Sequence, residues 1–125
     1  MKFARFLNDI CGATALEFGM TAPAFVLLMI AIVQGGLMFW TQLGLQQGVE
    51  MGARCASVNT ILCNSTSAVQ TYAAQATYGV NPPASTFSVA WNLPCGTQVS
   101  ASYAFPIISN YFGAATLQAQ SCFPK

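Results

Sequence analysis

The stretch from Gly12 to Trp40 reads GATALEFGMTAPAFVLLMIAIVQGGLMFW, and it decides the fold of this chain. After Glu17, no charged residue follows until Glu50. A bilayer core about 30 Å thick is crossed by roughly 20 apolar residues in an α-helix. Phe18–Trp40 is long and apolar enough for this, so it predicts a membrane-spanning helix with a carboxylate at its very start.

The composition argues against several classes of function. Of the 125 residues, 54% are hydrophobic and 6% are charged, the net charge is +1, and there is no histidine. Nucleic-acid binding needs a basic cluster, which is missing. Acid–base catalysis and zinc sites draw on His, Asp and Glu, and the acidic residues here are Asp9, Glu17 and Glu50. We therefore expect a protein that is not an enzyme and that binds no cofactor, metal or nucleic acid.

Residues 1–12 carry Lys2 and Arg5 against a single acid, Asp9. Positive charge before a membrane helix favours a cytoplasmic N-terminus, which would place the chain from about Thr41 outside the inner membrane. The apolar run is longer than that of a cleaved secretory signal, and no small-residue site closes it. This favours an anchor in the lipid bilayer over a secretory signal peptide.

The start of the quoted stretch resembles that of a known family. Gly12, then ATAL, then Glu17 and Phe18, followed by an apolar helix with Pro23, resembles the class III signal of type IV pilins and pseudopilins. GATALEFGMTAP is most similar to the start of the TadE-like proteins of the tight-adherence (Flp) pilus system. The resemblance implies that a prepilin peptidase cuts between Gly12 and Ala13. Glu17 and Phe18 would then be mature positions five and six.

The resemblance also implies a function and partners. It predicts a minor pseudopilin, a structural component of pilus assembly in the bacterial inner membrane, whose partners are other pilins, pseudopilins and inner-membrane assembly proteins. One alternative is a subunit of a type IV pilus or of a type II secretion pseudopilus. Another is an uncleaved, signal-anchored extracytoplasmic binding domain.

A carboxylate such as that of Glu17 is costly at the edge of hydrocarbon unless it is solvated or paired. Cleavage would free the α-amino group of Ala13. The amine of a neighbouring subunit could pair with Glu17 and set the register of a bundle of helices. The alternative is an interfacial glutamate that the dipole of the helix favours.

The helical pattern continues to about Val58, which divides the chain into a leader (1–12), a long helix (13–58, membrane-spanning at about 18–40) and an extracytoplasmic domain (59–125). Gly44, Gly48 and Gly52 form a stripe of small residues that lets another backbone approach closely. The stripe could pack against another subunit or against the protein's own C-terminal sheet. Glu50 and Arg54 are spaced for a surface ion pair.

The remainder predicts an α+β domain. Ser57–Ser67 is a polar loop, and a short second helix covers about Ser67–Tyr78 before the breaker Asn81-Pro82-Pro83. Alternating patterns then indicate three strands. Their ranges are Ser85–Asn92, Thr97–Phe105 and Ala114–Cys122. We expect a small antiparallel sheet that packs on the outer part of the long helix.

Cys11 would be removed with the leader, which leaves an even number of cysteines in an oxidising compartment. These are Cys55, Cys63, Cys95 and Cys122, for which three pairings are possible. If the last two strands form a hairpin centred near Ile108–Ser109, Cys95 lies opposite Cys122. Cys55–Cys63 is then the second pair, and it closes the end of the helix onto the following loop.

Overall fold

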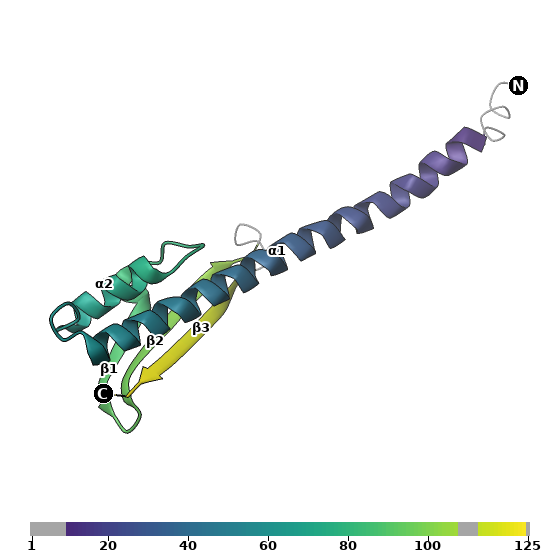
Figure 1. Ribbon diagram of the computed structural model, residues 1–125. Helices are drawn as coiled ribbons and strands as arrows, with labels where there is room; N and C mark the ends of the chain where they lie inside the picture. The colour runs from purple at the N-terminus through teal and green to yellow at the C-terminus, as the bar shows by residue number, and fades with distance from the viewer. Residues whose placement is uncertain (1–9, 108–112, 125) are drawn as a thin grey trace, which may run out of the picture. The chain divides into compact units, whose positions relative to one another are not determined.

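A computed structural model describes residues 10–107 and 113–124 of the chain (Figure 1). The chain forms two compact units, Met1–Gly35 and Gly36–Lys125, and the first helix contributes to both. The elements are α1 (Ile10–Val58), α2 (Thr66–Ala76), the short 3-10 helix η2 (Ala84–Thr86), β1 (Phe87–Leu93), β2 (Gly96–Pro106) and β3 (Ala114–Phe123). This is the predicted α+β fold, with a long apolar N-terminal helix, a second short helix and a three-stranded antiparallel sheet.

Pro23 lies inside α1, and the helix continues through it. Proline has no N–H, so the carbonyl of Gly19, four residues earlier, loses its helical donor. The hydroxyl of Thr21 donates to the carbonyls of Glu17 and Phe18, at 3.1 and 3.2 Å. One helix therefore spans the region, and no new helical segment begins at Pro23.

The sheet has the order β1-β2-β3, and both neighbouring pairs are antiparallel. The alternation expected along β2 and β3 is confirmed. Side chains of odd-numbered residues of these strands face the interior, and even-numbered ones face outward. The buried members are Thr97, Val99, Ala101, Phe105, Leu117 and Ala119.

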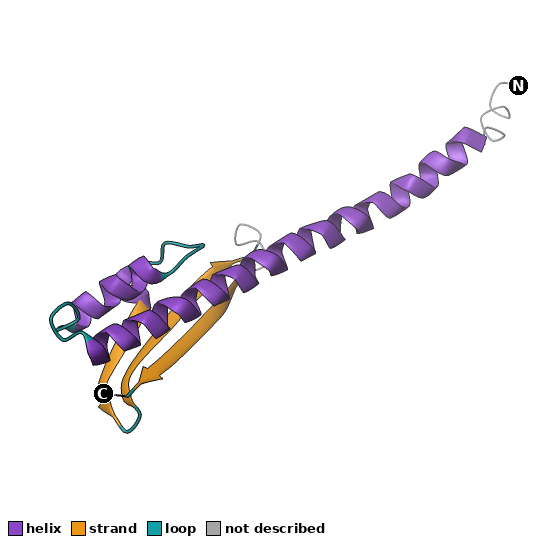
Figure 2. Cartoon of the chain, viewed as in Figure 1, coloured by secondary structure: helices purple, strands orange, loops and turns teal. Residues whose placement is uncertain are grey.

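The core of the second unit lies between this face of the sheet and the two helices (Figure 2). α1 contributes one stripe of side chains and α2 another. The buried helical members are Leu45, Val49, Ala53, Ala56, Val69 and Ala73. Phe87 of β1 is the largest fully buried side chain, and it anchors the sheet against the helices.

Two disulfides join Cys55 to Cys63 and Cys95 to Cys122, with Cα atoms 5.8 and 6.1 Å apart. These are the two pairs expected from the sequence. In a domain with so small a core, each bridge is typically worth about 2–4 kcal/mol, with the longer loop of Cys95–Cys122 giving more.

The hairpin register used to predict the second bridge was wrong. Gln98, and not Cys95, is the Cα partner of Cys122, which is a shift of three residues. Cys95 lies in the tight turn between β1 and β2, directly before Gly96. Gly96 has φ +117°, and a Cβ there would meet the carbonyl of Phe123, so the turn folds back closely onto the end of β3. The predicted hairpin centre, Ile108–Ser109, lies outside the described residues.

Candidate assembly surfaces

The predicted cleavage bond, Gly12–Ala13, lies within two turns of the start of α1 at Ile10. The first turn of the helix contains no acidic residue, and Gly12 is exposed. Glycine weakens a helix by about 1 kcal/mol relative to alanine. Gly12 therefore makes the helix locally weaker at the bond that a protease would have to bind in an extended form.

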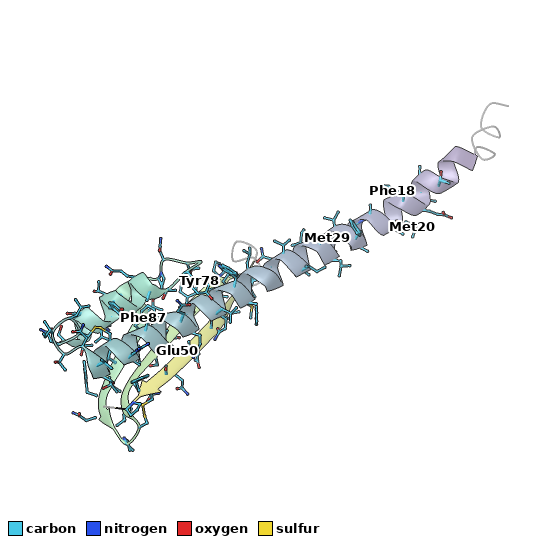
Figure 3. All side chains as sticks on the ribbon, viewed as in Figure 1. Phe18, Met20, Met29, Glu50, Tyr78 and Phe87 are labelled. Atoms are coloured by element: carbon cyan, nitrogen blue, oxygen red, sulfur yellow. A yellow bond between two sulfur atoms is a disulfide. The ribbon has the colours of Figure 1, made fainter. Side chains whose placement is uncertain are left out.

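Glu17 and Phe18 lie on α1 shortly after this bond, and both side chains are exposed. Phe18 has 73% of its surface accessible and projects from the helix (Figure 3). Among the described residues, no side chain forms an ion pair or hydrogen bond with the carboxylate of Glu17. Its carbonyl accepts the hydroxyl of Thr21. The carboxylate is therefore available to a group from another chain.

The helix that follows Glu17 is apolar around its whole circumference in the first unit. Met20 and Met29 project from it as Phe18 does (Figure 3). Its most apolar 18-residue window has a mean hydropathy of 2.1, and none of that window is buried within the chain. By length and composition, α1 could therefore serve as a membrane anchor. A helix exposed and apolar on all sides needs lipid or other helices around it.

The glycine stripe of α1 lies inside the second unit. Gly44, Gly48 and Gly52 are buried. A Cβ on Gly44 would collide with the backbone carbonyl of Tyr78, and one on Gly48 would meet the Thr77 hydroxyl and, at 2.9 Å, the Ala73 carbonyl. The stripe therefore brings α1 against α2 and the two residues that follow it.

The main partner of the stripe is thus α2, which neither alternative drawn from the sequence named. The sheet makes two looser contacts with the stripe. A Cβ on Gly48 would lie 3.4 Å from Phe87 of β1, and one on Gly52 would lie 3.6 Å from Val99 of β2, compared with 3.0 Å from Ala73 of α2. A buried stripe has no surface left for a neighbouring subunit. Contacts between subunits along this part of α1 have to use other residues.

Trp40 marks the point where α1 enters the folded domain. Its ring packs edge-to-face on Tyr78, with centroids 5.3 Å apart, and it covers Gly79. The next residue, Thr41, is buried and donates to the carbonyl of Leu37 at 2.9 Å. Trp40 keeps 54% of its surface exposed, so it can also lie at a membrane interface as the sequence suggested.

Glu50 and Arg54 are both exposed but do not form the expected pair. Among the described residues there is no ion pair between them, and the carboxylate of Glu50 instead accepts the side-chain amide of Gln46 at 3.2 Å. An exposed i, i+4 pair gains only tenths of a kcal/mol, so a competing hydrogen bond can replace it. Arg54 is left as a cation without an acidic partner in the described structure.

An exposed apolar cap, formed by Val58, Ile61 and Leu62, lies at the C-terminal end of α1. Ile61 has 89% of its surface accessible. The Cys55–Cys63 bridge and a 3.0 Å bond from the Leu62 amide to the Asn59 side chain hold this turn. This cap was not predicted, because Ser57–Ser67 is polar on average. The feature of the sequence that indicates it is the apolar pair Ile61-Leu62, which lies between Cys55 and Cys63.

The model of the TadE-like protein family matches residues 12–54 of the chain. The match spans most of α1, from the predicted cleavage site through the glycine stripe, and covers 43 of the 125 residues of the chain. It confirms the resemblance to the TadE-like family over these residues. No curated protein and no solved structure is significantly similar to the chain.

Proposed function

We propose that this protein is a minor pseudopilin of the TadE type, a structural component in the assembly of tight-adherence pili. The observation that carries the proposal is the family match over residues 12–54, on a helix whose large apolar side chains from Phe18 to Trp40 are exposed. A pilin-like helix needs this combination, because the same surface rests in lipid before assembly and packs against other helices after it.

A prepilin peptidase cleaves the chain after Gly12, and residues 13–58 anchor it with the N-terminus in the cytoplasm. The α+β domain then lies outside the inner membrane. The two disulfides suit that location, because bridges persist in oxidising compartments. The chain contributes contacts and no catalysis. Its partners are the peptidase, other pilins and pseudopilins, and inner-membrane assembly proteins.

The size of the domain favours a minor component over the main subunit of the fibre. Major pilins of this system resemble the α1 part alone and have little beyond it. Here a second helix and a three-stranded sheet follow α1. The exposed cap of Val58, Ile61 and Leu62 adds a candidate contact surface.

Deletion of the gene and complementation test this function. We expect deletion to abolish or strongly reduce surface pili, counted by electron microscopy, and the full chain to restore them. The level of the major pilin, measured by immunoblot, should stay unchanged, because the defect is in assembly. Normal piliation in the deletion strain would contradict the proposal.

A further inference from the structure

β3 forms one edge of the sheet, and its outward-facing backbone groups can be assigned. The amide of Ile107 donates to the carbonyl of Gly113 at 3.3 Å, in line with the register of β2 and β3. In an antiparallel ladder, alternate residue pairs exchange hydrogen bonds. Odd-numbered residues of β3 therefore bond β2, and the N–H and C=O groups of even-numbered residues, including Gln118, Gln120 and Cys122, point to the free edge.

This edge has few of the usual devices against strand pairing. Protein edges are normally protected by short strands, charges, prolines or bulges, or by a covering helix or loop. Here the side chain of Gln42 on α1 occupies one outward-facing carbonyl, that of Gln118. β3 has ten residues, from Ala114 to Phe123, with no charge and no proline. Its register with β2 runs without a break from Thr97↔Phe123 to Pro106↔Ala114.

The opposite edge, β1, is protected. Its register with β2 is interrupted between Ala90 and Leu93, where Asn92 has φ 58°. The side chain of Gln70 on α2 donates to the carbonyl of Phe87 at 2.6 Å, and the Trp91 indole donates to Thr66 at 3.1 Å. An irregular register thus protects β1 against pairing with another strand, whereas β3 has an unbroken register.

One face of α1, from Gln42 to Ser57, lies beside the outer edge of β3, and we call this face the wall. Gln42 donates from its side chain to the carbonyl of Gln118 at 2.7 Å, and Ser57 donates to that of Phe123 at 3.0 Å. On the helix face between these two contacts lie Gln46, Glu50 and Arg54, at helical spacings of four. The wall is therefore polar, and the Glu50 side chain lies on the part of α1 beside β3 (Figure 3).

A hollow of about 300 Å³ opens between this wall and the end of β3. It is lined by Glu50, Met51, Arg54, Ser121 and Phe123. Glu50 and Arg54 are not paired with each other, so both charges are free to meet polar groups from another chain. The hollow adds side-chain contacts to the backbone groups of the edge.

We propose that the outward-facing backbone groups of β3 other than the Gln118 carbonyl, namely the Gln118 N–H and both groups of Gln120 and Cys122, bind an extended segment of another pilin-like subunit of the same system, with the wall of α1 beside it. The inference rests on the proposed function for the identity of the partner. Only an extended backbone matches alternating N–H and C=O groups, as in other strand-addition sites. Every second side chain of the added strand faces Glu50 and Arg54 and is polar.

A second copy of this chain is a poorer occupant. Two β3 edges related by a two-fold axis would pair antiparallel. Because β3 runs in the same direction as the adjoining part of α1, from Gln42 beside Gln118 to Ser57 beside Phe123, the two α1 segments would then run in opposite directions. Copies inserted into one membrane through the same apolar run have to point the same way.

Amide hydrogen exchange on the full processed chain in detergent micelles tests the site directly. Each of the other pilin-like subunits of the system, purified in the same detergent, is added in turn. With the partner, the amides of Gln120 and Cys122 should exchange at least about tenfold more slowly. Those of Ala119 and Ser121, already bonded to β2, should not change. If no subunit protects the even-numbered amides, or if they are protected in the chain alone because it dimerises, the proposal is overturned.

A matched pair of variants separates the backbone group from the side chain. Gln120→Pro removes an outward N–H without breaking the ladder to β2, since edge strands tolerate proline on the free side. Gln120→Thr keeps that N–H, and both variants lose the side-chain bond to Gln98. We expect Gln120→Pro to bind the partner about tenfold more weakly than Gln120→Thr.

Equal affinity of the two variants, with both domains folded and both disulfides formed, would refute strand addition. The pilus phenotype separates this outcome from failure of the proposed function. If the deletion strain lacks pili but Gln120→Pro restores them as well as Gln120→Thr, the chain is a pilus component whose β3 edge has no partner. If deletion leaves piliation unchanged, the functional proposal itself fails.

Discussion

Gly44→Ala is expected to lower the free energy of unfolding of the α+β domain by about 3 kcal/mol, at the upper end of the range for overpacked sites. The added Cβ would collide with the backbone carbonyl of Tyr78, which cannot rotate away as a side chain would. Relief requires α1 to move from the segment after α2, and that movement also disturbs the ring contact between Trp40 and Tyr78. Chemical unfolding in detergent, followed by near-UV circular dichroism, measures the effect.

Gly36→Ala is the matched control. It lies on the same helix, and a Cβ there has no atom within 4 Å. Alanine favours a helix by up to about 1 kcal/mol over glycine, so this variant should be as stable as the wild type or slightly more so. Equal destabilisation by both variants would show that the loss comes from the helix itself and not from packing at Tyr78.

Glu17→Ala is expected to reduce surface pili at least tenfold while leaving the folded domain intact. If Glu17 pairs with the α-amino group of a neighbouring subunit in the assembled state, the variant leaves that amine in hydrocarbon without its carboxylate, and breaking a buried ion pair in this way typically costs about 3–5 kcal/mol. The carboxylate has no partner among the described residues of its own chain, so the domain loses no contact. Pilus counts and the melting temperature of the domain measure the two effects.

Glu17→Asp serves as the control. It keeps a carboxylate at the same exposed position of α1 and leaves the net charge unchanged, so piliation should change far less than in Glu17→Ala. Unchanged assembly in Glu17→Ala would rule out pairing between Glu17 and the amine, and would leave the glutamate as an interfacial residue.

The long helix and the strands could be predicted because their signals are local. The apolar run after Glu17 is long enough to cross a bilayer, and the alternation in β2 and β3 follows directly from which side chains are buried. The structure begins β1 at Phe87, two residues after the predicted start, because Ala84–Thr86 form a 3-10 turn.

Features that depend on distant parts of the chain were predicted less well. The spacing of Gly44, Gly48 and Gly52 indicates that another backbone segment packs closely on α1. Nothing in that spacing identifies α2 as this segment. The register of β2 and β3 depends on the length of the connection between them, which the assumed hairpin centre at Ile108–Ser109 did not give correctly. Both errors concern pairing partners, which sequence periodicity does not encode.

The other differences between the predictions and the structure concern side chains on the surface. Glu50 and Arg54 have the correct spacing for an ion pair, yet a nearby amide from Gln46 competes at similar free energy. Arg54 has no acidic partner among the described residues and lies beside β3, where its charge is part of the proposed strand-binding site. The exposed apolar cap at Ile61 was not predicted because it lies within a loop that is polar on average.

The intact mass of the mature protein, isolated from its native membrane under non-reducing conditions, tests the central claim most directly. Processing as a pseudopilin predicts a chain that begins at Ala13, with the residues up to Gly12 removed and the four remaining cysteines oxidised in two bridges. The same preparation from cells without the prepilin peptidase should retain Met1. A chain that begins at Met1 in both preparations would contradict pilin-type processing and identify the protein as a plain membrane-anchored domain.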